Sequence, residues 1–315
     1  MIQYLIILLD DASVSFCHYK NDGRQGVRNL MSTETLKAGI LYGMKENLNI
    51  QFVYPDYELP DEYKQIIDTI DHTDIKPLHG AGDADVLVSD GCMAFAESEL
   101  SGNGTYVLRT DRKDLFANYG VLRDVLQKVQ RLNVVLTDVE RFTEDDFAEY
   151  KKVLDDVAEC VCECYIKGKP VQVNILTDRM MLDNMNNCGA GDISVTLAPD
   201  GRFYVCPAFY YAKDGSAVGD LEHGLDIKNS QLYKLDHAPL CRICDAYQCR
   251  RCIWLNRKTT LEVNTPGHEQ CVVAHLERNA SRKLLADIRR HGSFMPEREI
   301  KEITYLDPFE IKEQW

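Results

Sequence analysis

The chain has 315 residues, 45% of them hydrophobic and 27% charged, which is enough for one large domain and one smaller one. Its formal net charge of −14 argues against nucleic acid or an anionic membrane as a partner, because phosphate binding needs a basic surface. The first apolar run, residues 4–9, is too short to span a bilayer and lacks the basic flank of a signal peptide. We therefore expect a cytoplasmic protein with no membrane span.

Short apolar runs alternate with amphipathic segments through the first half of the chain. The expected strands are residues 4–9, 50–54, 85–89, 105–109, 133–137 and 171–176. The expected helices are residues 32–48, 61–70, 93–100, 112–130 and 143–166. Such strand–helix units predict a parallel α/β sheet, either open or bent into a partial barrel.

Nearly every expected strand ends at an aspartate. These residues are Asp10, Asp11, Asp56, Asp90, Asp111, Asp138 and Asp178. Each one alone is typical of a helix cap or a turn. Together they would make one face of a parallel barrel acidic, which leaves open a metal site or a site for a cationic ligand.

Cysteines gather in the second half of the chain, after residue 185. A β-hairpin is expected there from residues 193–197 and 202–206, joined by the turn sequence APDG. The seven cysteines of this region are Cys188, Cys206, Cys241, Cys244, Cys249, Cys252 and Cys271. The chain has twelve cysteines in all, and in a reducing compartment we expect metal ligands or packing residues rather than disulfides.

Two CxxC pairs are separated by only four residues, at Cys241–Cys244 and Cys249–Cys252. A single zinc held by four cysteines usually has a longer spacer between its pairs. The compact spacing is closer to iron–sulfur ligation, and a structural zinc site is the alternative. Histidines of the same region are candidates for an eighth ligand, although each alone is typical of an ordinary polar residue: His223, His237, His268 and His275.

The other cysteines are expected to pack in the core. Cys160, Cys162 and Cys164 lie along an expected helix, and Cys92 follows a strand. Cys17 stands alone in the loop after the first strand, and its role is left open.

The sequences CGAGDISVTLAPDGRFYVCP and CRICDAYQCRRC, followed by a last cysteine, resemble the SPASM domain of radical SAM peptide and protein maturases. The resemblance implies one four-iron cluster on Cys241, Cys244, Cys249 and Cys271. It implies a second cluster on Cys188, Cys206 and Cys252. The strand–helix units resemble the partial barrel that precedes SPASM domains. The implied architecture is a (β/α)6 TIM-like partial barrel of the radical SAM type at residues 1–180. A cysteine-rich α+β domain at 181–280 follows it, and then a C-terminal helix and tail at 281–315.

The loop after the first strand departs from that family. Active radical SAM enzymes carry CxxxCxxC there, and in this register the three positions hold Asp10, Val14 and Cys17. One thiolate cannot retain a four-iron cluster. The glycine pair of the second-strand motif is also missing from YPDYELP, where Glu58 alone matches. We therefore do not expect S-adenosylmethionine to bind, and we expect radical chemistry to be lost.

Over the whole chain, YLIILLDDASVSFCHY, LKAGILYGMKENLNIQFVYPDYELP and the cysteine-rich tail resemble the CXXX repeat peptide maturase family. That resemblance implies a role in modifying ribosomally made peptides with cysteine repeats, beside an active radical SAM maturase. A non-catalytic adaptor that presents the precursor peptide, with structural clusters or zinc, is the alternative. Whether the protein turns over a substrate is left open.

Overall fold

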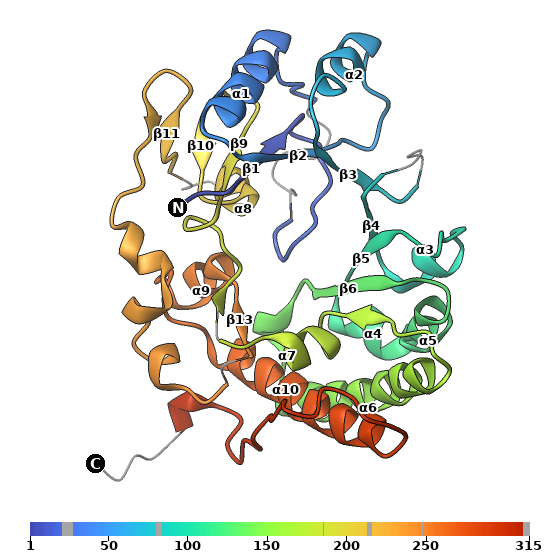
Figure 1. The fold of residues 1–315 in the computed structure, drawn as a ribbon. Coiled ribbons are helices and arrows are strands. Elements are labelled where there is room, and N and C mark those ends of the chain that lie inside the picture. The colour runs from blue at the N-terminus through green and yellow to red at the C-terminus, as the bar shows by residue number, and fades with distance from the viewer. Residues whose placement is uncertain (21–27, 80–83, 185, 213–215, 247, 311–315) are drawn as a thin grey trace. The chain divides into compact units, whose positions relative to one another are not determined.

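The computed structural model describes residues 1–20, 28–79, 84–184, 186–212, 216–246 and 248–310 (Figure 1). The chain divides into two compact units. Unit 1 comprises Met1–Val88 and Gly189–Tyr233, and unit 2 comprises Ser89–Cys188 and Lys234–Trp315. Each unit therefore combines an early and a late part of the chain. The domain boundaries expected at residues 180 and 280 stay a prediction.

Unit 1 is built on a mostly parallel sheet. Its strands run in the order β10, β9, β1, β2, β3, β4, and only β10 is antiparallel to its neighbour. The elements are β1 (Tyr4–Leu8), α1 (Thr33–Lys45), β2 (Asn49–Val53), α2 (Asp61–Ile67), β3 (Thr73–Pro77), β4 (Val86–Asp90, which runs into unit 2), β9 (Ser194–Leu197), β10 (Phe203–Tyr204), α8 (Pro207–Tyr211), β11 (Gly219–Asp220), β12 (Gly224–Leu225) and the 3₁₀ turn η2 (Ser230–Tyr233).

The predicted hairpin is confirmed as β9 and β10, with Phe203 opposite Leu197. Its first strand also lies parallel to β1, so Val195 and Ile50 flank Leu5 on its two sides. These apolar side chains form one buried core with α1 and α2. The late hairpin is therefore an integral part of the sheet that begins at the N-terminus.

Helix α1 packs on that sheet through small residues. Ser32 caps the helix by accepting a hydrogen bond from the Thr35 backbone N–H at 3.1 Å. Leu36, Ile40 and Gly43 recur at helical spacing on the buried face. A Cβ atom on Gly43 would lie 2.7 Å from Ile50 Cδ1, so glycine here permits the close approach of helix and strand.

Unit 2 contains the parallel strands β5, β6 and β7, with helices packed around them. Its elements are α3 (Cys92–Ala96), β5 (Thr105–Thr110), α4 (Arg112–Asn118), α5 (Gly120–Leu126), β6 (Arg131–Leu136), η1 (Val139–Arg141), α6 (Glu144–Ile166), β7 (Gln172–Val173), α7 (Thr177–Met181), β8 (Asn186–Asn187), η3 (Leu235–His237), η4 (Cys241–Ile243), β13 (Arg250–Arg251), α9 (Ile253–Thr260), α10 (His268–Arg289) and η5 (Pro308–Glu310).

The long helices α6 and α10 lie side by side in unit 2 (Figure 1). Helix α6 begins with a capping box between Thr143 and Asp146, which satisfies backbone N–H groups at both positions. Cys160, Cys162 and Cys164 are buried on this helix, and Cys92 is fully buried, which confirms that these four cysteines pack in the core. Among the described residues, no helix combines the length and the apolar character needed to traverse a bilayer.

Candidate metal centre

Four of the seven predicted ligands line one buried cavity in unit 2. They are Cys241, Cys244, Cys249 and Cys271, the set that the resemblance assigned to a single cluster. The cavity is small, about 20 Å³, which is room for roughly one water molecule. His275 and Arg251 also line it.

Two tight turns and one helix bring these thiols together. The Cys244 N–H donates to the Cys241 carbonyl at 3.2 Å and closes the 3₁₀ turn η4, in which residues three apart lie on the same side. A second turn, from the Cys249 N–H to the Ala246 carbonyl at 2.8 Å, returns Cys249 to the cavity. Cys271 lies in the first turn of α10, and its N–H donates to the Gly267 carbonyl at 3.2 Å.

The environment keeps the thiols protonated in the absence of a cation. Burial raises the pKa of Cys241 and Cys244, and it raises the pKa of Cys249 to about 11. Burial also raises the pKa of Cys271, and the neighbouring thiols Cys249 and Cys241 add to the rise because adjacent thiolates repel. A metal must be bound by thiolates, so binding here would release protons.

His275 follows Cys271 by one turn of α10 and faces the same thiols. Its Nε2 lies 3.6 Å from Cys244 Sγ, and its ring packs edge-on against Tyr305. Burial lowers the pKa of His275 to about 4, so the imidazole is neutral near pH 7. A neutral imidazole is a possible metal ligand or a hydrogen-bond donor to a thiolate. Of the four histidines noted in the sequence, His275 is the one that lines this cavity.

The residues present fit a thiolate-bound metal group in the chemistry of their donors. Four cysteines line one cavity, and the buried Arg251 that also lines it has two guanidinium nitrogens, Nε and Nη2, with no hydrogen-bond partner among the described residues. An anionic group in the cavity would satisfy those donors. Within the described ranges no three Cys, His, Asp or Glu side chains already converge on one point as ligands, so binding requires the thiols to turn inward.

The second predicted set is divided between the units. Cys188 and Cys252 are neighbours in unit 2, because β8 pairs with β13 and the Cys188 N–H donates to the Arg251 carbonyl at 2.9 Å. Cys188 is exposed and Cys252 is half-buried. Cys206 precedes α8 in unit 1. A cluster on Cys188, Cys206 and Cys252 therefore stays a prediction.

The loop after β1 is held by side chains of unit 1. Asp10 is fully buried, accepts hydrogen bonds from the Tyr57 hydroxyl at 2.8 Å and from the Ala12 N–H at 2.6 Å, and fixes its own turn. Asp11 accepts a hydrogen bond from the Tyr210 hydroxyl. Cys17 is exposed. The predicted position of the first cluster cysteine is thus occupied by a carboxylate with a structural role.

Four of the other strand-end aspartates also have partners. Asp111 caps α4, and Asp90 pairs with Arg109 at 2.7 Å. Asp138 accepts the Arg112 N–H at 2.9 Å, and Asp178 pairs with Arg131 at 2.6 Å. Asp111 therefore caps a helix as predicted, whereas Asp90, Asp138 and Asp178 form ion pairs with arginines. Glu58 is exposed and pairs with Lys64 at 2.6 Å.

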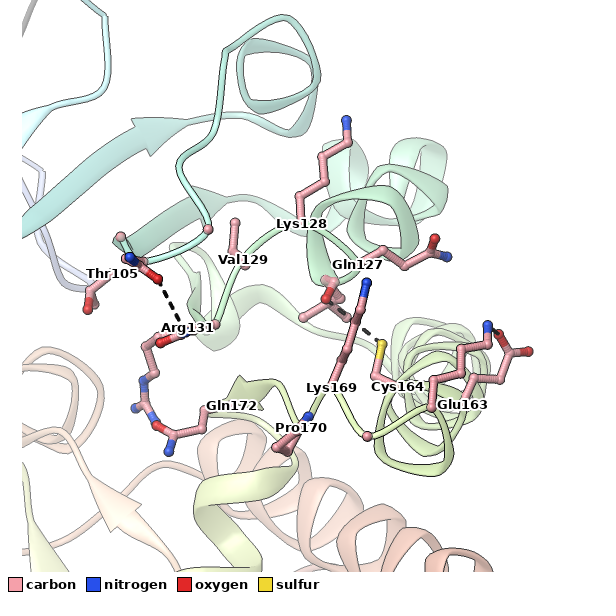
Figure 2. A pocket seen from close by; sticks show the side chains of 17 residues that line it. Thr105, Gln127, Lys128, Val129, Arg131, Glu163, Cys164, Lys169, Pro170 and Gln172 are labelled. Atoms are coloured by element: carbon pink, nitrogen blue, oxygen red, sulfur yellow. Dashed lines mark hydrogen bonds and ion pairs between the residues drawn. The ribbon is translucent and has the colours of Figure 1, made fainter.

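A larger pocket of about 1040 Å³ lies at the amino ends of β5, β6 and β7 in unit 2 (Figure 2). Sequence reasoning did not predict it. Lys128 and Lys169, on its border, follow the carboxyl ends of α5 and α6, where a cation is favoured by the helix dipole. Arg131 is already paired with Asp178, and Lys167 lies 3.4 Å from Glu163. The charges of this pocket therefore have local explanations.

Comparison with solved structures identifies the fold. Native anSMEcpe with bound AdoMet and Cp18Cys peptide covers 92% of this chain and 100% of its own, with a TM-score of 0.63 and 11% sequence identity. The chain therefore shares the fold of anSMEcpe. The predicted α/β class, with a mostly parallel sheet, is therefore confirmed.

Two further structures of that protein match in the same way. Native anSMEcpe with bound AdoMet and Kp18Cys peptide covers 91% of this chain and 99% of its own, with a TM-score of 0.62 and 11% identity. Native anSMEcpe with bound AdoMet aligns with 90% of this chain and with 99% of its own length, at a TM-score of 0.60 and 12% identity. No family model matches the sequence. A search of curated proteins finds no match either.

Proposed function

We propose that this protein takes part in peptide maturation, as a radical SAM-like protein that carries auxiliary four-iron clusters and lacks the cluster that binds S-adenosylmethionine. The observation that carries the proposal is the cavity lined by Cys241, Cys244, Cys249 and Cys271. A SPASM-like domain would require these four to act as one ligand set. Cys188, Cys206 and Cys252 would hold the second cluster.

The proposed substrate is a ribosomally made precursor peptide with cysteine repeats, as in CXXX repeat peptide maturation. Solved structures of the same fold contain the Cp18Cys and Kp18Cys peptides, which supports a peptide as the partner. An active radical SAM maturase would supply the radical chemistry that this chain lacks. The auxiliary clusters would bind a substrate thiol or transfer electrons.

The loop after β1 supports the loss of the radical site. Asp10 and Asp11 are buried there and hydrogen-bonded to Tyr57 and Tyr210, and one exposed thiol, Cys17, cannot retain a four-iron cluster. S-adenosylmethionine should therefore not bind. Isothermal titration of the anaerobically purified protein with S-adenosylmethionine should give no binding heat.

Metal analysis tests the proposal directly. The protein would be purified without oxygen, and iron, sulfide and zinc would be quantified per chain in the wild type and in three variants. About eight irons are expected in the wild type and in Cys17→Ala. Cys244→Ala should lose about four of them. Cys162→Ala, a buried cysteine away from the cavity, is the matched control and should keep all of them.

Either of two results would contradict the proposal. About twelve irons that fall to eight in Cys17→Ala would make the protein an active radical enzyme. Iron contents that are equal in Cys244→Ala and the wild type would remove Cys244 from the ligand set.

A zinc-bearing adaptor is the second candidate, because four cysteines around one cavity also suit a structural zinc ion. In that case the purified protein would contain zinc without iron. It would still bind a fluorescent cysteine-repeat peptide in an anisotropy titration.

A further inference from the structure

Arg251 is a charged side chain buried without a charged partner. It is 1% exposed and is among the largest fully buried side chains of the described chain. Its Nη1 donates to the Asn264 carbonyl at 3.0 Å, while Nε and Nη2 have no hydrogen-bond partner among the described residues. Over the same residues no carboxylate forms an ion pair with it. A guanidinium stays protonated, so this arrangement is costly unless an anion compensates it.

Another buried arginine of the same unit has the partners that Arg251 lacks. Arg179 donates to Glu277 Oε2 from Nε at 3.1 Å and also from Nη2, and its Nη1 donates to the Gln248 carbonyl at 2.9 Å. The protein therefore compensates one buried guanidinium fully with its own groups. The missing compensation at Arg251 points to a group that is not part of the polypeptide.

The strand geometry directs Arg251 toward the cysteines. In β13, Arg250 is exposed and Arg251 is buried, as expected for neighbouring residues on opposite faces of a strand. Arg251 lines the same cavity as Cys241, Cys244, Cys249 and Cys271. Burial raises the pKa of the Cys241 thiol, and the nearby Arg251 guanidinium partly offsets that rise. Arg251 and the four cysteines thus line one cavity.

We propose that Arg251 donates N–H···S hydrogen bonds to the sulfur atoms of the cluster on these four cysteines, and that it raises the reduction potential of that cluster. The proposal rests on the function proposed above. A four-iron cluster with four thiolates is an anion, and one-electron reduction makes it more negative. A buried cation and N–H donors stabilise the reduced state more than the oxidised state. By raising the reduction potential, Arg251 would allow a biological electron donor to reduce the cluster.

The test is a redox titration of the anaerobically purified protein with dithionite and mediators, followed by electron paramagnetic resonance. Arg251→Met removes the charge and the N–H donors at similar length, and Arg251→Lys keeps the charge. Arg250→Met changes the exposed neighbour by the same charge and is the matched control. Iron and sulfide are counted in every sample, so cluster loss and a shift of potential are measured separately.

In Arg251→Met the reduced state should be disfavoured at least tenfold, which lowers the midpoint by about 59 mV for one electron. Arg251→Lys should show a smaller decrease, and Arg250→Met none. If the Met variant loses iron, the Lys variant decides: a lowered midpoint supports the role, and an unchanged midpoint refutes it. A full iron content with an unchanged midpoint in Arg251→Met also refutes it. A wild-type protein without iron would instead refute the proposed function.

Discussion

The ion pair between Arg179 and Glu277 offers a quantitative test of how unit 2 is stabilised. The Arg179 side chain is 12% exposed and that of Glu277 6%. The Tyr150 hydroxyl donates to Glu277 Oε1 at 3.0 Å, so both carboxylate oxygens are hydrogen-bonded. Glu277→Gln keeps the shape of the side chain and removes its charge, which leaves a buried guanidinium uncompensated.

Breaking such a pair by removing one partner costs about 3–5 kcal/mol. At roughly 2–4 °C per kcal/mol for a domain of this size, the melting temperature should fall by about 6–20 °C. Urea unfolding, followed by circular dichroism, measures the free energy of unfolding. Lys151→Met breaks an exposed pair with Asp155 in the same unit and should leave the urea midpoint unchanged within error.

The double variant Arg179→Met with Glu277→Gln separates the pair interaction from general disruption. Its loss of unfolding free energy should be smaller than the sum of the losses in the two single variants by at least about 1 kcal/mol, because no buried charge is then left without a partner. If the two costs simply add, or if Glu277→Gln costs under about 1 kcal/mol, the pair does not stabilise unit 2 as described.

Three further predictions concern unit 1. Tyr57→Phe should lower the free energy of unfolding by about 1–3 kcal/mol, because buried Asp10 loses a hydrogen-bond donor. The Tyr42 hydroxyl has no partner among the described residues, so Tyr42→Phe should lower it less in the same urea assay. Gly43→Ala should destabilise by about 1–3 kcal/mol, since the added methyl group meets the buried Ile50; an unchanged urea midpoint would contradict this contact. Hydrogen bonding to Asp220 raises the pKa of His223. The pair therefore stabilises the fold while His223 is protonated, and this stabilisation is lost as the pH rises through the raised pKa. In Asp220→Asn the pKa of His223, measured by NMR titration, should return to its ordinary range.

Most strands and helices of the first half could be predicted from their apolar periodicity, but a few have sequences that do not show it clearly. Strand β3 has one buried residue, Ile75, between charged residues, and it ends at Pro77, so its pattern is weak. The helix expected at 112–130 is divided at Tyr119, next to Gly120, because glycine is a poor helix former. Helix α10 spans His268–Arg289, so it overlaps the start of the C-terminal segment expected at 281–315.

The sequence predicted the cysteines that line the cavity, but not the other residues around them. Cysteine spacing alone predicted a metal site from the pairs Cys241–Cys244 and Cys249–Cys252, and the resemblance to SPASM domains implied the set that includes Cys271. Nothing in the sequence marks Arg251 as buried, since an arginine beside a second arginine is typical of an exposed surface. Its burial depends on the pairing of β13 with β8, and pairing between distant segments is not encoded in local periodicity.

The position of β9 has a consequence for the order in which this protein can fold during synthesis. Strand β1 is complete within the first eight residues, yet one of its two neighbours, β9, ends at Leu197. Until the ribosome has released that segment, one edge of β1 lacks its partner, and an open edge invites pairing with other chains. A fragment that stops at residue 180 should therefore aggregate, and a nascent chain should need a chaperone until the hairpin has emerged.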